Sequence, residues 1–310
     1  MKLKCTLLFG LLFSLLSCGA SNEQKIKNSI EVANNLLSTR KCDEAIRELE
    51  SVGQQTSNPR WLITYSSAYA CKGGFSEPSF FANDLAKISS ANDGLIGSLT
   101  LFSTSSTDGP FSTEYANLQR ALEILLYPAG LTTSSHTSRL TKFTTSELSN
   151  MEVVAFYIAL TQMGRYFYYY GDAGPTGTKG GGGAPNTCLA TYTDGAAITA
   201  IDVLATDSCN SGTNLGHTDI ETGVAATRQT RMCHGIVLFN NFIDLISNLT
   251  FSGANTGSLS ALGAVFTTLC ETAMGGAVPI CSVKDQTSCE AATNADVEGY
   301  FAKVLETFFI

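Results

Sequence analysis

The chain has 310 residues, of which 15% are charged and 44% hydrophobic, and its formal net charge is −8 at pH 7. An acidic surface repels nucleic acid and anionic lipid headgroups, so this composition argues against a nucleic-acid-binding protein. The hydrophobic content excludes wholesale disorder and is sufficient for one large domain or two smaller ones.

The first residues combine a positive start with a short apolar run. Lys2 and Lys4 precede an apolar stretch that ends at Ser17. This stretch is shorter than the roughly 20 residues that a helix needs to cross a bilayer. The pattern predicts an export signal over residues 1–17. An ordinary signal peptide with a chance cysteine and a buried core helix are the alternatives.

The end of the apolar run, LLSC at residues 15–18, resembles the lipobox of bacterial lipoproteins. The resemblance implies cleavage between Ser17 and Cys18, a diacylglyceryl group on the Cys18 sulfur, and an acyl chain such as palmitate on its new amine. Two or more acyl chains give stable membrane anchoring. Gly19 replaces the aspartate that marks inner-membrane retention in enteric bacteria, which implies the outer membrane. Residues 18–25 then form a lipidated tether.

Residues 26–90 show the apolar periodicity of paired helices. A shift of 33 positions superposes two copies, with large apolar residues matching large ones and small residues matching small ones. This pattern resembles the tetratricopeptide repeat, whose unit is two antiparallel helices of about 34 residues. The resemblance implies helical hairpins over residues 26–130. Ser29 and Leu62 stand where the repeat usually has an aromatic residue, and Pro78 replaces a small residue.

Eight cysteines remain once Cys5 is removed and Cys18 is lipidated. An even number in an exported chain predicts four disulfides, with free buried thiols as the alternative. In a tetratricopeptide-like stack, the second helix of one unit runs antiparallel to the first helix of the next. The resemblance therefore implies a bond between Cys42, which begins the former, and Cys71, near the end of the latter.

The other six cysteines lie in the second half of the chain. Cys188 and Cys209 flank a short predicted helix, and we expect a disulfide to tie its ends together. The last four cysteines admit three pairings, among which the sequence does not choose: Cys233, Cys270, Cys281 and Cys289.

Residues 131–310 also read as helical, so the predicted fold class is all-α. We expect a loop-rich, disulfide-stapled part that packs on the first part as one body, with a glycine-rich loop at residues 171–186. The predicted helices after the repeat region are residues 113–126, 146–170, 194–204, 219–249, 258–274 and 296–309.

Five consecutive aromatic residues end the helix predicted at 146–170. Two interpretations are open, a central buried helix and an aromatic ligand-binding surface, because tyrosine offers both apolar area and a hydroxyl. With the aromatic residues of the repeat region, the candidate binding surface comprises Trp61, Tyr65, Tyr69, Tyr166, Tyr168, Tyr169 and Tyr170.

The sequence contains no recognisable catalytic or metal-binding motif. The glycine-rich loop lacks the Gly-Lys-Ser/Thr of a P-loop, and residues 207–218 have Cys209, Ser211 and Thr218 at positions where an EF-hand uses acidic or amide side chains. Cys233 and His234 are adjacent in a predicted helix, so their side chains point about 100° apart and do not form a catalytic pair by adjacency alone. We therefore expect no cofactor and no metal.

These observations favour a lipid-anchored protein of the cell envelope that binds a protein or peptide partner through a helical-repeat surface. A second hypothesis is a solute-binding accessory, because the architecture is similar to the T-components associated with tripartite transporters. A third is an envelope hydrolase that uses a carboxylate pair.

Overall fold

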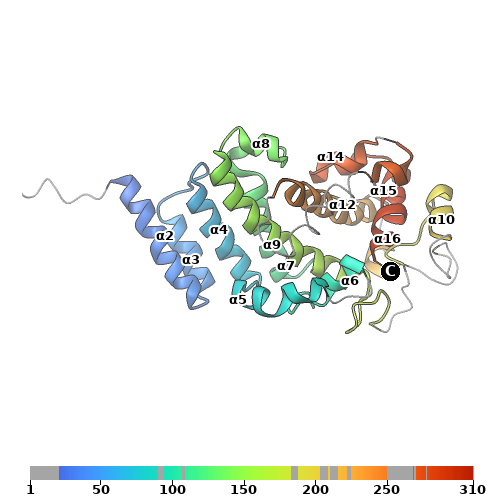
Figure 1. Ribbon diagram of the computed structural model, residues 1–310, viewed down its shortest axis with the longest axis horizontal. Helices are drawn as coiled ribbons and strands as arrows, with labels where there is room; N and C mark the ends of the chain where they lie inside the picture. Colours follow the sequence, from blue (N-terminus) through green and yellow to red (C-terminus); the bar gives the residue numbers. More distant parts are fainter. Residues whose placement is uncertain are drawn as a thin grey trace, which may run out of the picture.

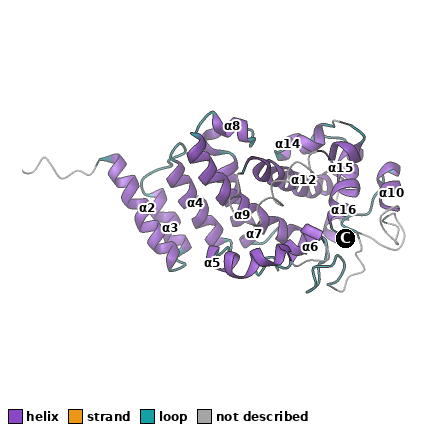
Figure 2. Ribbon diagram, viewed as in Figure 1, coloured by secondary structure: helices purple, strands orange, loops and turns teal. Residues whose placement is uncertain are grey.

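The computed structural model describes residues 21–89, 94–106, 109–182, 188–202, 209, 216–221, 225–249, 268, 270–276 and 278–309. All regular secondary structure in these ranges is helical, so the protein is all-α in the part described (Figure 2). Ser17, Cys18 and most of the helix expected at 258–274 lie outside the described residues. No helix of the described part is long and apolar enough to span a membrane.

The longer helices follow the predicted ranges closely. Where the sequence predicts 113–126, 146–170 and 219–249, the structure has Thr113–Leu126, Thr145–Tyr170 and Ala225–Asn248. The helices used below are α2 (Asn22–Ser38), α3 (Cys42–Glu50), α4 (Pro59–Lys72), α5 (Glu77–Ser79), α6 (Gly94–Thr100), α7 (Thr113–Leu126), α8 (His136–Leu140), α9 (Thr145–Tyr170), α10 (Gly195–Asp202), α11 (Thr218–Glu221), α12 (Ala225–Asn248), α14 (Gln286–Glu290), α15 (Asn294–Tyr300) and α16 (Glu306–Phe308).

Helices α2, α3 and α4 lie side by side at the N-terminal end of the described chain (Figure 1). Asn58 caps α4 by accepting a hydrogen bond from the backbone N–H of Trp61, and Pro59 occupies the first turn, where proline is tolerated. The indole of Trp61 donates to the carbonyl of Leu49 at 3.2 Å, which fixes α4 against α3. Cys42 is bonded to Cys71, the pairing that the repeat resemblance implied.

The chain departs from the repeat pattern after α4. In place of a second long helix, the structure has the single turn α5, a π-helical turn at Phe80–Asp84 and a 3₁₀ turn at Leu85–Ser89. The buried carboxylate of Asp84 accepts a hydrogen bond from the backbone N–H of Ser103 at 2.7 Å, which ties this segment to the residues that follow α6. Helix α4 packs instead mainly on α7.

Helix α9 runs through the centre of the described body and contacts α4, α6, α7, α8 and α12 (Figure 1). It starts with a capping box, in which Thr144 and Glu147 exchange hydrogen bonds between side chain and backbone. A Cβ added at Gly164 would lie 2.4 Å from the carbonyl oxygen of Leu99 in α6, so this contact requires glycine. The structure therefore supports the interpretation of this segment as a central buried helix.

A buried ionic network joins α8, α9 and α12. Arg139 is fully buried and donates through Nη2 to Glu152 at 2.6 Å and to Asp244 at 3.0 Å. His136 adds a contact from Nδ1 to Glu152 at 2.8 Å, and Lys284 pairs with Asp244 at 2.6 Å. Each carboxylate is thereby matched by at least one cation, which offsets the cost of removing it from water.

Two buried glutamates attach the segment at 188–194 to the C-terminal helices. Glu298 in α15 accepts hydrogen bonds from the backbone N–H groups of Thr193 and Asp194, both at 2.7 Å. Glu306 in α16 accepts from the backbone N–H of Leu189 at 2.7 Å and from the hydroxyl of Tyr192 at 2.6 Å. These contacts position a loop that has little regular structure of its own.

Burial by itself would raise the pKa of Glu298, but the N–H groups of Asp194 and Thr193 favour the ionised form more strongly and lower it below its ordinary value. A lowered folded-state pKa stabilises the fold above the unfolded pKa, and this contribution is lost as the pH falls through the folded pKa. We expect Glu298→Gln to lower the free energy of unfolding by about 1.5–3 kcal/mol at pH 7 and by less at pH 3.

Urea unfolding at both pH values measures the effect of Glu298→Gln. Glu31→Gln, at an exposed position of α2, is the matched control and should be close to neutral at either pH. An equal loss for Glu298→Gln at pH 7 and pH 3 would show that its charge contributes nothing.

Candidate ligand-binding groove between α7 and α12

Helices α7 and α12 both pack on α9 but make little direct contact with each other. The space between them is a groove with a volume of about 320 Å³, which we call the α7–α12 groove. Its walls are mainly apolar and include Leu122 and Leu126 of α7, Val237 and Leu238 of α12, and Tyr170 of α9. The groove therefore forms because α7 and α12 both pack on the buried helix α9 and not on each other.

The first residue of α14 and the segment that precedes it border the groove. The hydroxyl of Tyr127 donates to the backbone carbonyl of Lys284 at 2.6 Å, and the Asn241 side chain donates to the same carbonyl at 2.9 Å. Gln286 lines the groove and donates to the carbonyl of Thr230 at 2.8 Å. These bonds link the end of α7, the middle of α12 and the start of α14.

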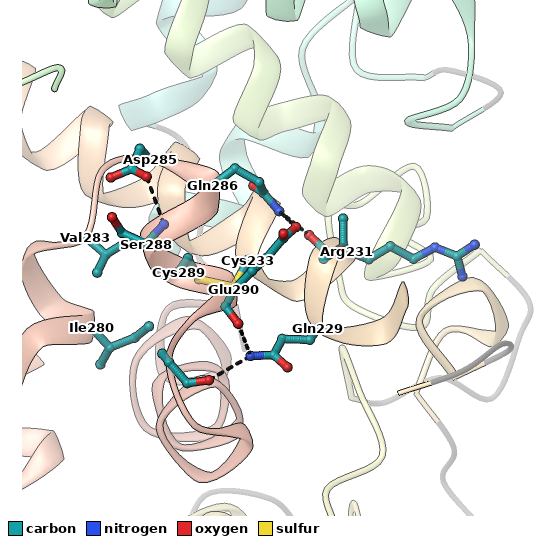
Figure 3. The surroundings of a disulfide bond; sticks show 12 residues. Gln229, Arg231, Cys233, Ile280, Val283, Asp285, Gln286, Ser288, Cys289 and Glu290 are labelled. Carbon is teal, nitrogen blue, oxygen red and sulfur yellow. Dashed lines mark hydrogen bonds between the residues drawn. A yellow bond between two sulfur atoms is a disulfide. The ribbon is translucent and has the colours of Figure 1, made fainter. Parts of the chain in front are cut away.

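A disulfide holds α14 against α12 beside the groove. Cys233 of α12 and Cys289 of α14 are both fully buried and bonded to each other, which selects one of the pairings that the sequence left open. Figure 3 shows Gln286, one turn before Cys289, reaching toward α12 near Arg231. The Gln229 side chain donates to the carbonyl of Glu290 at 3.0 Å on the other side of the disulfide.

The other disulfides lie away from the groove. Cys188 is bonded to Cys209, as the sequence predicted, and both are buried in the core. Cys270 is bonded to Cys281, which completes the pairing of the last four cysteines.

The polar part of the groove centres on His234. Its Nε2 lies 3.2 Å from the Oε1 of Gln119, which also receives a hydrogen bond from Gln162 at 3.3 Å. The Nε2 of Gln119 donates to Glu123 at 3.1 Å, so both ends of this amide are engaged. The network joins α7, α9 and α12 at the base of the groove.

The imidazole of His234 is neutral at physiological pH. Burial lowers its pKa to about 4, because the charged form loses hydration and no carboxylate compensates. The ring instead contacts the rings of Tyr115 and Tyr166, at centroid distances of 5.5 and 6.1 Å.

The groove also carries an exposed aromatic side chain. Phe111 is 68% exposed, the largest value among the exposed large hydrophobic residues of the described chain. The guanidinium of Arg231 lies 5.2 Å from the centroid of its ring, within the range of a cation–π contact. Both residues line the groove, so this part of the lining combines an apolar surface with a positive charge.

The residues of the predicted aromatic binding surface do not form an exposed surface in the structure. Trp61, Tyr65, Tyr166 and Tyr170 are all buried, and Tyr69 is half-buried. The indole of Trp61 stacks on Tyr65 with ring centroids 4.4 Å apart, and Tyr166 donates to the backbone carbonyl of Arg231 at 2.9 Å. These side chains pack within the core of the fold, which is the physical reason that they do not form one exposed face.

The remaining predicted aromatics are partly covered. Tyr168 and Tyr169 are half-buried, and the hydroxyl of Tyr169 donates to Asp219 in α11. Tyr170 lines the α7–α12 groove, while Trp61 and Tyr65 line a separate hollow of about 210 Å³ between α4 and α7. Three residues of the predicted binding surface therefore do line hollows, but they line two separate hollows and not one common surface.

No local sequence signal marks the residues that make the groove polar. Gln119 and His234 are 115 positions apart, and Arg231 and Phe111 carry no motif. Within the described ranges, no three His, Cys, Asp or Glu side chains converge on a metal-sized site. Searches of protein-family models, of curated proteins and of solved structures find no match for this chain.

Two disulfides pair the last four cysteines, and we expect Cys233–Cys289 to stabilise the fold more than Cys270–Cys281 does. It closes a separation of 56 residues, against 11 for Cys270–Cys281. On the loop-entropy model, replacing both cysteines by serine costs about 4 kcal/mol for the first pair and about 3 kcal/mol for the second. Chemical unfolding of the two double variants gives the comparison. A smaller loss for Cys233→Ser/Cys289→Ser than for the other pair would contradict it.

Proposed function

We propose that the chain is a lipid-anchored binding protein of the cell envelope and that the α7–α12 groove holds a small, mainly apolar ligand. The groove is the observation that carries this proposal. Its volume of about 320 Å³ lies at the lower end of the range of roughly 300–1,000 Å³ that is usual for small-molecule sites. Its apolar walls with a few fixed polar groups are typical of such sites.

The location rests on the sequence and on the disulfides. The motif LLSC at residues 15–18 supports lipidation of Cys18. The four disulfides of the described chain are favoured in an oxidising compartment outside the cytoplasm. Both features support an exported ligand-binding body, and the motif supports its attachment to a membrane by N-terminal acyl chains.

The burial of the aromatic cluster favours the second sequence hypothesis over the first. A partner protein that bound the predicted aromatic surface would need side chains such as Trp61 and Tyr166, which are enclosed in the core. A ligand within the helical body needs only the groove. We therefore favour a solute-binding accessory of an envelope transport system, with the α2–α4 helices as its tetratricopeptide-like part.

The hydrolase hypothesis has less support at this site. Among the described residues that line the groove, Glu123 is the one carboxylate, whereas the mechanism needs two. Glu152 and Asp244, which do lie close together, share the guanidinium of Arg139.

Filling the groove tests the binding proposal. We expect the full chain carrying Cys18→Ser, which avoids detergent, to bind the neutral dye N-phenyl-1-naphthylamine saturably. Val237→Phe places extra volume in the groove and should weaken this binding at least about tenfold, equivalent to roughly 1.4 kcal/mol. Fluorescence titration gives the affinity. Val32→Phe, the same change at a position of α2 that is 46% exposed, should leave it unchanged. Equal affinities for the three proteins would rule out the groove as the binding site.

Metabolic labelling tests the anchor. An alkyne analogue of palmitate should label the full chain in a bacterial host and place it in the membrane fraction, because acylation requires the Cys18 thiol. Cys18→Ser should abolish both the label and the membrane association, while Cys5→Ser should retain both. Label that persists in Cys18→Ser would show that the lipid is attached elsewhere or that the motif is not used.

A further inference from the structure

The hydrogen-bond network at the base of the groove fixes which nitrogen of His234 carries the proton. The backbone carbonyl of Tyr115 can only accept, so the side-chain nitrogen of Gln162, 3.4 Å away, must be a donor. That nitrogen also lies 3.3 Å from the Oε1 of Gln119, which is therefore an acceptor. The Nε2 of His234, 3.2 Å from the same oxygen, must then carry a hydrogen.

A second contact agrees with this assignment. The other end of the Gln119 amide lies 3.1 Å from a carboxylate oxygen of Glu123, so this end must be the NH₂ group. Reversing the amide would set oxygen against oxygen at Glu123 and nitrogen against nitrogen at Gln162. Two independent neighbours therefore give the same orientation of Gln119.

A neutral imidazole with a proton on Nε2 has an unprotonated Nδ1, which is a hydrogen-bond acceptor. No donor from the described part of the chain reaches Nδ1 of His234. The ring is part of the groove lining. In the described chain, Nδ1 is not among the fully buried side-chain nitrogen and oxygen atoms that lack a hydrogen-bond partner. The acceptor is thus open to whatever occupies the groove.

We propose, resting on the function proposed above, that the groove selects neutral ligands whose apolar body carries one O–H or N–H donor, and that this donor binds Nδ1 of His234. The apolar body lies against Leu122, Val237 and Leu238. A carboxylate or sulfonate oxygen would meet the lone pair of Nδ1 and be repelled. A molecule without a donor would leave Nδ1 unpaired in an apolar site.

A matched pair of probes separates the hydrogen bond from apolar contact. Indole offers one N–H donor, and N-methylindole has the same ring without it. We expect indole to displace N-phenyl-1-naphthylamine from the Cys18→Ser chain at a concentration about 3–10-fold lower than N-methylindole, the range for one hydrogen bond. His234→Phe should abolish this preference, because it removes the acceptor and keeps an aromatic ring.

Nitrogen-15 spectra of the histidine rings give a readout that does not depend on the variant folding. The chain has three histidines, so His136→Gln and His217→Gln suffice to assign the signals. Without probe, His234 should show one protonated and one unprotonated nitrogen. Indole should shift the unprotonated signal in the direction of hydrogen bonding, and N-methylindole should not.

The outcomes distinguish the two proposals. If both probes displace the dye equally and the Nδ1 signal does not move, the donor selection is wrong while the groove remains a binding site. A proton on Nδ1 in the free protein would overturn the selection directly. If neither probe displaces the dye and Val237→Phe binds the dye as well as the unmodified groove, both proposals fail.

Discussion

The burial of α9 on almost every side is the constraint on which the rest of the structure depends. Its side chains from Leu148 to Tyr170 are largely enclosed, so neighbouring helices must cover it all round. A helix that is buried over most of its circumference accepts partners at several angles, and α4, α6, α7, α8 and α12 all pack on it. Because α7 and α12 are each satisfied by α9, they do not need to close on each other, and the groove remains between them.

The burial of α9 encloses several of its polar side chains. Each needs a partner from a surrounding element, since an unpaired buried polar group is destabilising. Glu152 is matched by Arg139 and His136, and Arg165 donates to the backbone carbonyl of Thr104 at 2.8 Å. Gln162 reaches α7 and becomes part of the network under the groove. The same helix thus provides the apolar support of the site and part of its polar base.

Local signals in the sequence predicted much of the fold but little of the site. The start of α9 was predicted at residue 146, one residue from its position in the structure, and the capping box of Thr144 and Glu147 that fixes it acts within a few residues. The Cys42–Cys71 bond followed from antiparallel helices close in sequence. The turns after α4 were missed because the partner of Asp84 is the distant backbone of Ser103.

The groove was not predictable for the same reason. Its polar centre joins Gln119 to His234 across 115 positions, and neither residue belongs to a spaced motif. The aromatic run at 166–170 was one part of the predicted binding surface, yet Tyr166, Phe167 and Tyr170 are buried, and Tyr166 donates to the backbone carbonyl of Arg231. Composition alone does not distinguish an aromatic core from an aromatic surface, because both bury large rings against apolar partners.

Native mass spectrometry of the lipidated chain taken from its own envelope tests the central claim most directly. We expect the chain to carry a small neutral molecule in addition to its acyl groups, and the Val237→Phe chain prepared in the same way to lack it. A chain that carries no such molecule, or a Val237→Phe chain that carries it equally, would contradict the assignment of the α7–α12 groove as the ligand site.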